Sequence, residues 1–207
     1  EKAYVAPCTH DEFYDFVSGG FNGNISVYGL ASGRLLKIIP AFTVFPENGY
    51  GFSEETKAML NTSHGWIPWD DQHHISISET DGVQDARWLF GNANNTPRIA
   101  RVDLTTFRTV EILEIPHAGG NHSSPFITEN TEYVVAGTRF SIPIGDKLDV
   151  PIDSYKENFK GSLSFVSVDP QSGRMKLAFQ VLMPGMDFDL ARGGRGPSKD
   201  WMFFSCY

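Results

Sequence analysis

The sequence is short of cysteine, of long apolar runs and of positive charge, and each shortage argues against a class of protein. Its two cysteines, Cys8 and Cys206, stand near opposite ends and form no CxxC pair, so it carries neither a zinc knuckle nor a dithiol redox motif. No apolar run approaches the ~18 residues of a membrane-spanning helix. The net charge is −8 and the lysines and arginines are scattered, so we expect no membrane span and no nucleic-acid partner.

Helix signals are scarce as well. Twenty glycines and twelve prolines punctuate short runs rich in valine, isoleucine, phenylalanine and threonine, which is typical of an all-β protein with tight connections. The exceptions are SEETKAML (53–60), where Ser53 is placed to cap a first turn, and HDEFYDF (10–16). The overlapping EFYDFVSGG (12–20) also resembles the second strand of a blade. The rest of the chain predicts strands and turns.

A hairpin pattern recurs three times, at residues 24–40, 98–116 and 163–184. Each copy has a β run, a five-residue step from the first turn residue to an arginine, a second β run and a closing proline. Inserted loops must separate the copies, because their spacing exceeds that of regular propeller families. The turns begin at Gly29, Asp103 and Asp169 and end at Arg34, Arg108 and Arg174.

Two shorter strands precede each of the later hairpins: HHISIS (73–78) with RWLFGN (87–92), and SPFIT (124–128) with EYVVAGTRF (132–140). Four strands are the content of one propeller blade, and a ring typically needs 4 to 8 blades. We therefore predict an all-β partial β-propeller of about three irregular four-stranded blades over residues 1–207. Its edge strands should be unpaired in isolation.

Histidines stand at equivalent positions of two successive units. His73 and His74 come at the head of one innermost strand, and His122 precedes the next. Because innermost strands run along the central channel, we expect the three imidazoles to converge at its mouth. Imidazole nitrogens suit copper, zinc or nickel, so the sequence predicts a metal site there.

Adjacent side chains on a regular strand point to opposite faces, so His73 and His74 share one site only where the backbone is not regularly extended. Metal-bound histidines usually hold their second ring nitrogen with a carboxylate or carbonyl, and Asp70 or Asp71 is placed to do this. We interpret the remaining histidines, His10, His64 and His117, as structural or solvated, and Cys8 as a small packed residue. We interpret the tryptophans as packing residues: Trp66, Trp69, Trp88 and Trp201.

Several segments together resemble one known family. They are YVAP, DEFYDFVSGG with GNISVYG, DDQHHIS, RWLF, RIARVDL and GGNHSS, and they follow one another in order between Tyr4 and Tyr207. They resemble nitrous oxide reductase, specifically its N-terminal propeller, and look most like the divergent, Sec-exported branch, in which the pair reads DDxHHIS.

The resemblance implies a periplasmic, homodimeric copper oxidoreductase that reduces nitrous oxide to dinitrogen and water in denitrification, with electrons from a donor cytochrome or cupredoxin. It implies a seven-bladed propeller that holds a tetranuclear copper–sulfide cluster through seven histidines. A C-terminal cupredoxin domain would carry a binuclear copper site. Residues 1–207 would then be the N-terminal part of the propeller, with the other blades and that domain outside this chain, so we expect this fragment alone to be inactive.

The resemblance also assigns residues. It implies His73, His74 and His122 as copper ligands and Asp71 as the carboxylate behind them, with no catalytic residue beyond the metal ligands. Ser76 stands where the better-known branch has a further histidine, so no ligand role is carried there. Tyr207 matches a tyrosine that begins the family's calcium-binding segment.

Two other functions fit the residues. One is a zinc or di-metal hydrolase that uses the DDxHH segment (70–74), which would need a further set of carboxylate or histidine ligands. The other is a non-catalytic binding propeller, in which loops such as FPENGYGF (45–52) present a partner surface and the histidine pair is incidental. Metal analysis separates the three functions. Copper with sulfide indicates the reductase, zinc indicates the hydrolase, and no bound metal indicates the binding propeller.

Overall fold

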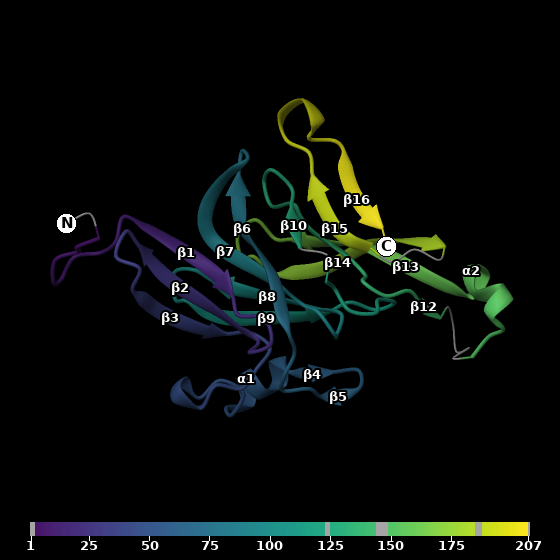
Figure 1. Ribbon diagram of the computed structural model, residues 1–207, viewed down its shortest axis with the longest axis horizontal. Coiled ribbons are helices and arrows are strands. Elements are labelled where there is room, and N and C mark those ends of the chain that lie inside the picture. Colours follow the sequence, from purple (N-terminus) through teal and green to yellow (C-terminus); the bar gives the residue numbers. More distant parts are fainter. Residues whose placement is uncertain (1–2, 123–124, 144–148, 185–187, 207) are drawn as a thin grey trace.

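The computed structural model describes residues 3–122, 125–143, 149–184 and 188–206, and in these parts the chain is built mainly from antiparallel strands (Figure 1). The first sheet has the order β1-β2-β3. Its strands are β1 (Phe13–Ser18), β2 (Asn24–Leu30) and β3 (Leu35–Pro40).

Of the two predictions for this segment, the helix at residues 10–16 is wrong and the second strand at 12–20 is confirmed, because most of the segment belongs to β1. Its register against β2 runs from Phe13 opposite Leu30 to Ser18 opposite Ile25. Aromatic and β-branched side chains favour a pleated, half-buried surface over a helix, and FYDFV offers four of them in five residues. The charged residues that suit a first helical turn did not outweigh this preference.

The second sheet is a four-stranded meander in the order β6-β7-β8-β9. The third sheet has β10, β11, β13 and β14 in sequence across it, and the short β12 also pairs with β13. Their strands are β6 (Gln72–Thr80), β7 (Val83–Ala93), β8 (Arg98–Asp103), β9 (Arg108–Glu114), β10 (Phe126–Ile127), β11 (Tyr133–Gly137), β12 (Ile142–Pro143), β13 (Phe159–Val168) and β14 (Met175–Pro184).

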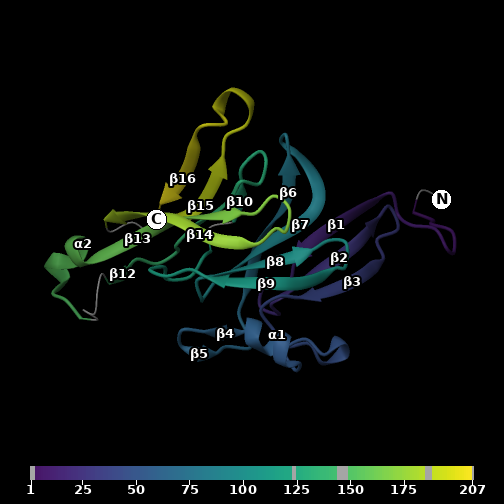
Figure 2. The same cartoon turned by 180° about the vertical axis from the view of Figure 1, so that it is seen from behind.

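A fourth unit contains the hairpin of β15 (Phe188–Gly193) and β16 (Met202–Cys206). The outer strand β9 of the second sheet contacts β3 of the first and β14 of the third (Figure 2). At the inner edges, β6 contacts β1 and β10, and β10 contacts β15. Successive sheets therefore lie side by side as blades do, which confirms the partial β-propeller.

Apolar side chains fill the space between neighbouring sheets. Ile25 and Val27 of the first sheet pack with Leu89 of the second. Phe90 of the second sheet packs in a separate cluster with Val134 of the third. These residues are fully or almost fully buried, so each sheet is stabilised mainly by its neighbours.

The three predicted hairpins are confirmed as β2–β3, β8–β9 and β13–β14. The amide of Gly29 donates to the carbonyl of Arg34 over 2.9 Å, and Asp169 donates to Arg174 over the same distance. In the second hairpin, Asp103 and Arg108 are directly opposed in the ladder. The repeated spacing therefore marks three hairpin turns whose first and last residues lie opposite each other.

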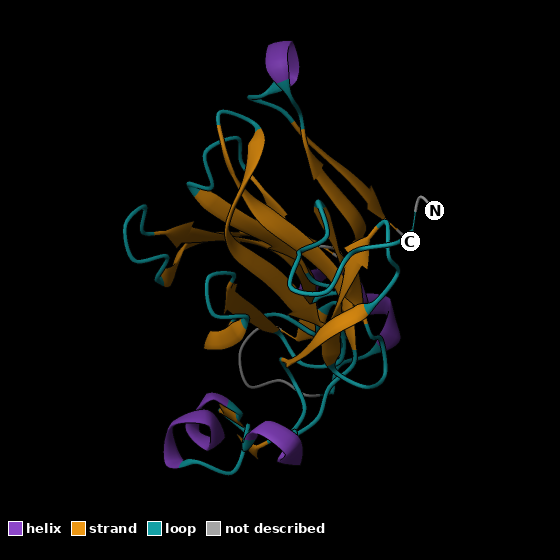
Figure 3. Ribbon diagram, turned by 90° about the vertical axis from the view of Figure 1, so that its left-hand side faces the viewer, coloured by secondary structure: helices purple, strands orange, loops and turns teal. Residues whose placement is uncertain are grey.

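Helices lie at the periphery of the strands (Figure 3). The predicted helix at 53–60 is confirmed as α1 (Glu54–Met59), and Ser53 Oγ accepts from the amide of Thr56. In the described parts of the chain, no helix has the length and apolarity needed to cross a membrane. Short elements of the inserted loops were not predicted: η1 (Pro46–Asn48), β4 (Asn61–Thr62), β5 (Gly65–Trp66), η2 (Ile152–Ser154), α2 (Tyr155–Asn158) and η3 (Gly196–Ser198).

The first sheet lacks an innermost strand among the described residues. Its β2–β3 hairpin is equivalent to β8–β9, so β1 takes the place of the second strand, β7.

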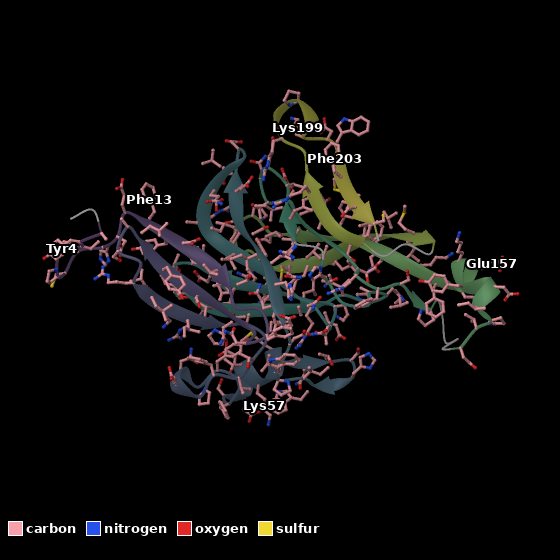
Figure 4. The ribbon with its side chains drawn as sticks, in the orientation of Figure 1. Tyr4, Phe13, Lys57, Glu157, Lys199 and Phe203 are labelled. Carbon is pink, nitrogen blue, oxygen red and sulfur yellow. The ribbon has the colours of Figure 1, made fainter. Side chains whose placement is uncertain are left out.

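A cavity of about 540 Å³ lies beside β1 and is lined by residues of β1, β6, β10 and β15. Phe13 on β1 and Phe203 on β16 are 62% and 58% exposed (Figure 4). Both ends of this partial ring therefore expose apolar strand surface.

Candidate metal centre

A β-bulge places both histidines of the pair on one site. Gln72 pairs with Ala93 and Ile75 pairs with Gly91, so His73 and His74 together face one residue of β7. Two residues opposite one is the pattern of a bulge, which breaks the alternation of side chains and re-aims them. The two ring centroids lie 5.8 Å apart. The bulge thus provides the irregular backbone that two adjacent histidines need in order to reach one site.

The single residue opposite the bulge fixes its backbone. Asn92 Oδ1 accepts a hydrogen bond of 2.6 Å from the amide of His74, and the Asn92 side chain also donates to the carbonyl of Asn121. Asn92 is fully buried. It therefore ties the bulge in the second sheet to the segment that leads into β10 of the third.

His122 lies beside the pair although it belongs to the next sheet. Its ring centroid is 4.8 Å from that of His73 and 5.3 Å from that of His74. One ligand atom from each of the three residues lies within 4.8 Å of the others, and all three residues are partly buried. The structure thus brings together the three side chains that the sequence singled out.

Asp71 stands directly behind the cluster. Its carboxylate is 1% exposed, and Oδ2 lies 2.7 Å from Nε2 of His73. A carboxylate that accepts a hydrogen bond from the Nε2–H group fixes the tautomer of the ring and leaves Nδ1 as the nitrogen that can bind a metal. Asn94 Nδ2 donates to the same Oδ2 over 3.2 Å. The carboxylate is thereby held from two sides.

Asp70 faces the opposite way and serves the loop that leads into β8. Its oxygens accept hydrogen bonds from the amide and side chain of Asn95, both at 3.0 Å, and from the amide of Thr96 at 2.8 Å. Arg98 Nη2, fully buried, lies 3.5 Å away, and burial lowers the pKa of Arg98. Of the two aspartates, Asp71 is the one whose carboxylate contacts His73.

The other predicted residues lie elsewhere. Ser76 Oγ donates to the carbonyl of Pro125 over 2.5 Å and so connects β6 to the segment before β10. Tyr207 lies outside the described residues. His10, His64 and His117 are exposed, in agreement with the solvated interpretation.

Two packing predictions need correction. Cys8 is exposed rather than packed, because the segment before β1 crosses the surface without a neighbouring sheet. Of the four tryptophans, only Trp88, on β7, is buried, whereas Trp66, Trp69 and Trp201 are 46 to 67% exposed. These three lie in an inserted loop and a hairpin connection, where no second sheet covers them.

Sequence reasoning missed the polar residues that support the site, above all Asn92, Asn94 and Arg139. The GNANNTPR segment (91–98) did offer a signal, because three asparagines beside a predicted strand end are unusual unless they bond to backbone or side chains. Arg139 offered none, since its contact with Asn94 joins segments that are far apart in the sequence.

Fold and site together define a β-propeller protein with a three-histidine candidate metal centre where two blades meet. No protein-family model matches the chain. Curated nitrous-oxide reductases do match it, and the chain is similar to them over most of its length. This confirms the resemblance that its motifs carry.

The nitrous-oxide reductase of Pseudomonas fluorescens is 34% identical over 186 residues, which are 89% of this chain and 28% of the relative. That of Stutzerimonas stutzeri is 32% identical with the same coverage. The chain thus spans between a quarter and a third of the length of these relatives. Among solved structures, the hydrazine synthase of Kuenenia stuttgartiensis covers 83% of this chain, which spans 38% of it, with a TM-score of 0.52 and 15% identity. This last likeness concerns the fold alone.

Proposed function

We propose that this chain forms the N-terminal part of the propeller of a copper enzyme that reduces nitrous oxide to dinitrogen and water. The observation that carries the proposal is the convergence of His73, His74 and His122 from two blades, in a chain related to nitrous-oxide reductases. In the reaction, nitrous oxide takes up two electrons and two protons and gives dinitrogen and one water.

The donor set fits copper. Three imidazoles with no carboxylate among them suit copper better than a hard cation, which prefers oxygen. Nitrogens bound at about 2.0–2.1 Å to one tetrahedral ion lie roughly 3.3 Å apart, whereas these donor atoms lie within 4.8 Å. Distances of up to 4.8 Å between the donor atoms are compatible with one ion bound by all three histidines, and also with several metal atoms that each bind different histidines. A copper–sulfide cluster, when bound, supplies the electrons and binds the substrate.

The chain's own residues would then hold the cluster and take no direct part in the reaction. His73, His74 and His122 are the ligands, and none is assigned acid–base chemistry. Asp71 orients the ring of His73 through the 2.7 Å contact between Oδ2 and Nε2. The bulge in β6 keeps His73 and His74 on the same site.

The remaining parts of the enzyme extend the proposal beyond this chain. The three-stranded first sheet supports a ring completed by further blades. The number of blades that we propose, seven, is the one that the family resemblance implies. Those blades would supply the other cluster ligands. A C-terminal cupredoxin domain with a binuclear copper site, a calcium site that includes Tyr207, a homodimer, a periplasmic location and a cytochrome or cupredoxin donor complete the proposed enzyme.

The geometry favours this reading over the hydrolase. A di-metal hydrolase would use Asp70 and Asp71 as ligands, but Asp70 accepts from Asn95 and Thr96. Asp71 is turned to His73. A binding propeller with an incidental pair would give no reason for a third imidazole at 4.8 Å from His73.

Metal analysis of the full-length enzyme tests the proposal. We expect His122→Ala to lower the copper content and abolish nitrous oxide reduction, because it removes one of three converging donors. His73→Ala should do the same. The exposed His117 provides the control, since His117→Ala removes an imidazole outside the cluster and should leave copper content and activity unchanged. Wild-type copper and activity in His122→Ala would refute the assignment.

A further inference from the structure

Asn94 holds Asp71 at two points. Its amide nitrogen donates to the carbonyl of Asp71 over 2.8 Å, and its side-chain Nδ2 donates to Asp71 Oδ2 over 3.2 Å. Asn94 is 8% exposed, so these bonds are shielded from water. The carboxylate that contacts His73 is therefore placed by a residue at the end of β7.

The same side chain reaches the segment that carries His122. Asn94 Oδ1 accepts from Arg139 Nη1 over 3.1 Å. The amide of Arg139 in turn donates to the carbonyl of Gly120 over 3.1 Å, two residues before His122. An asparagine side chain is a donor and an acceptor at once, and Asn94 uses one function towards each histidine segment.

Close packing reinforces this connection. Gly120 has φ +88, and a Cβ built on it would lie 2.3 Å from the carbonyl oxygen of Asn94. Only glycine combines this backbone conformation with such an approach. The entry to His122 thus lies directly against Asn94, and the two segments have little freedom to separate.

We propose that Asn94 and Arg139 are positioning residues that set the distance between His122 and the His73–Asp71 pair. The inference rests on the proposed function for its purpose, since three ligands from two blades bind one centre only if the blades are held in register. Asn94 connects the blades at the level of the ligands. Arg139 extends the connection to the far side of the His122 segment.

The affinity test uses the intact chain, prepared without metal and titrated with Co²⁺ alone. Substitution of residues that hold metal ligands typically costs 10- to 100-fold in affinity. We expect Asn94→Leu, which removes both side-chain functions at similar volume, to weaken Co²⁺ binding at least 10-fold. Arg139→Met, at a partly exposed position, should weaken it less and leave the fold intact.

The control is the neighbouring asparagine, which has the same side chain at an exposed position. Asn95 Nδ2 donates to Asp70 Oδ1 over 3.0 Å, so Asn95→Leu loses a comparable bond on the side that faces away from the histidines. We expect Asn95→Leu to lower the free energy of unfolding but to leave Co²⁺ affinity as in the wild type. Asn94 is buried and Asn95 is exposed, so urea unfolding of both variants measures how far a loss of stability accompanies a loss of affinity.

A second measurement needs no metal. In crystal structures of the metal-free variants, the ring separation between His73 and His122 should increase in Asn94→Leu and Arg139→Met, and stay near 4.8 Å in Asn95→Leu. If the wild type binds no Co²⁺ but the rings still separate in the two variants, the positioning role stands and the metal site falls.

Unchanged ring separation in Arg139→Met and in any folded Asn94 variant would overturn the positioning role. Wild-type Co²⁺ affinity in those variants would overturn it as well. Either result leaves the metal site itself intact, so the two proposals fail separately.

Discussion

Asp70 and Asp71 are adjacent carboxylates of equal burial, yet they serve two different regions. Asp70 belongs to a clamp formed with Asn95, Thr96 and Arg98, in which its oxygens accept several protein donors. Asp71 belongs to the histidine site, where its Oδ2 faces an imidazole and one amide. In the clamp, the negative charge of Asp70 is paired with Arg98. In the histidine site, metal-binding nitrogens of three imidazoles lie close to one another. Burial alone therefore does not distinguish a structural carboxylate from a functional one.

The largest expected effect comes from breaking the clamp. Asp70→Ala leaves the fully buried Arg98 without its carboxylate, and loss of one partner of a buried pair typically costs about 3–5 kcal/mol. We expect the free energy of unfolding in urea to fall by that amount. A loss below about 1 kcal/mol would show that Asp70 is not a stabilising group and would erase the contrast with Asp71.

Asp71→Asn tests the other side. The amide keeps the shape of the carboxylate but accepts more weakly from His73, so we expect metal affinity to fall about 10- to 100-fold. The free energy of unfolding should change by no more than about 1 kcal/mol. Metal titration and urea unfolding of the same preparation measure both quantities. A variant that loses stability while keeping its affinity would reverse the two roles.

Asp85, at the far end of the same β6–β7 hairpin, should behave like the clamp. Burial raises its pKa, but hydrogen bonds outweigh burial and hold the pKa at about 2. Because the folded pKa lies below the unfolded value near 3.8, its contribution is present above pH 4 and lost as pH falls towards 2. The difference between a pKa of 3.8 and one of about 2 corresponds to a contribution of roughly 2 kcal/mol.

Unfolding measured between pH 4 and pH 2 checks this contribution. Asp85→Asn should flatten the stability curve in that range, because the carboxylate that takes up the proton is gone. An unaltered curve would mean that other carboxylates carry the acid sensitivity.

The features that could be predicted from the sequence depend on local chemistry or on repetition. The turns from Gly29 to Arg34 and from Asp169 to Arg174 repeat one spacing, so the hairpins were readable. The meeting of His73 with His122 followed from equivalent positions in two units, without any knowledge of contacts. Residues 10–16 were ambiguous because seven residues carry too little periodicity to separate a strand from a short helix.

The supporting contacts were beyond sequence reasoning for a physical reason. The bond between Arg139 and Asn94 joins the segments that follow β7 and β11, and its geometry depends on how the two sheets pack. The choice between Asp70 and Asp71 likewise depends on the direction in which each side chain leaves the backbone. Pattern and propensity do not contain that information.

The bulge in β6 makes deletion and substitution of a histidine different experiments. Removing either His73 or His74 from the chain would leave one residue opposite Asn92 and restore a regular ladder between the Gln72–Ala93 and Ile75–Gly91 pairs. The side chains from Ile75 onward would keep their faces. The surviving imidazole would follow the pleat, on the same side as Asn92. The two histidines together form the bulge. A strand shortened by one of them would keep its pairing with β7 but would no longer place two imidazoles at one site.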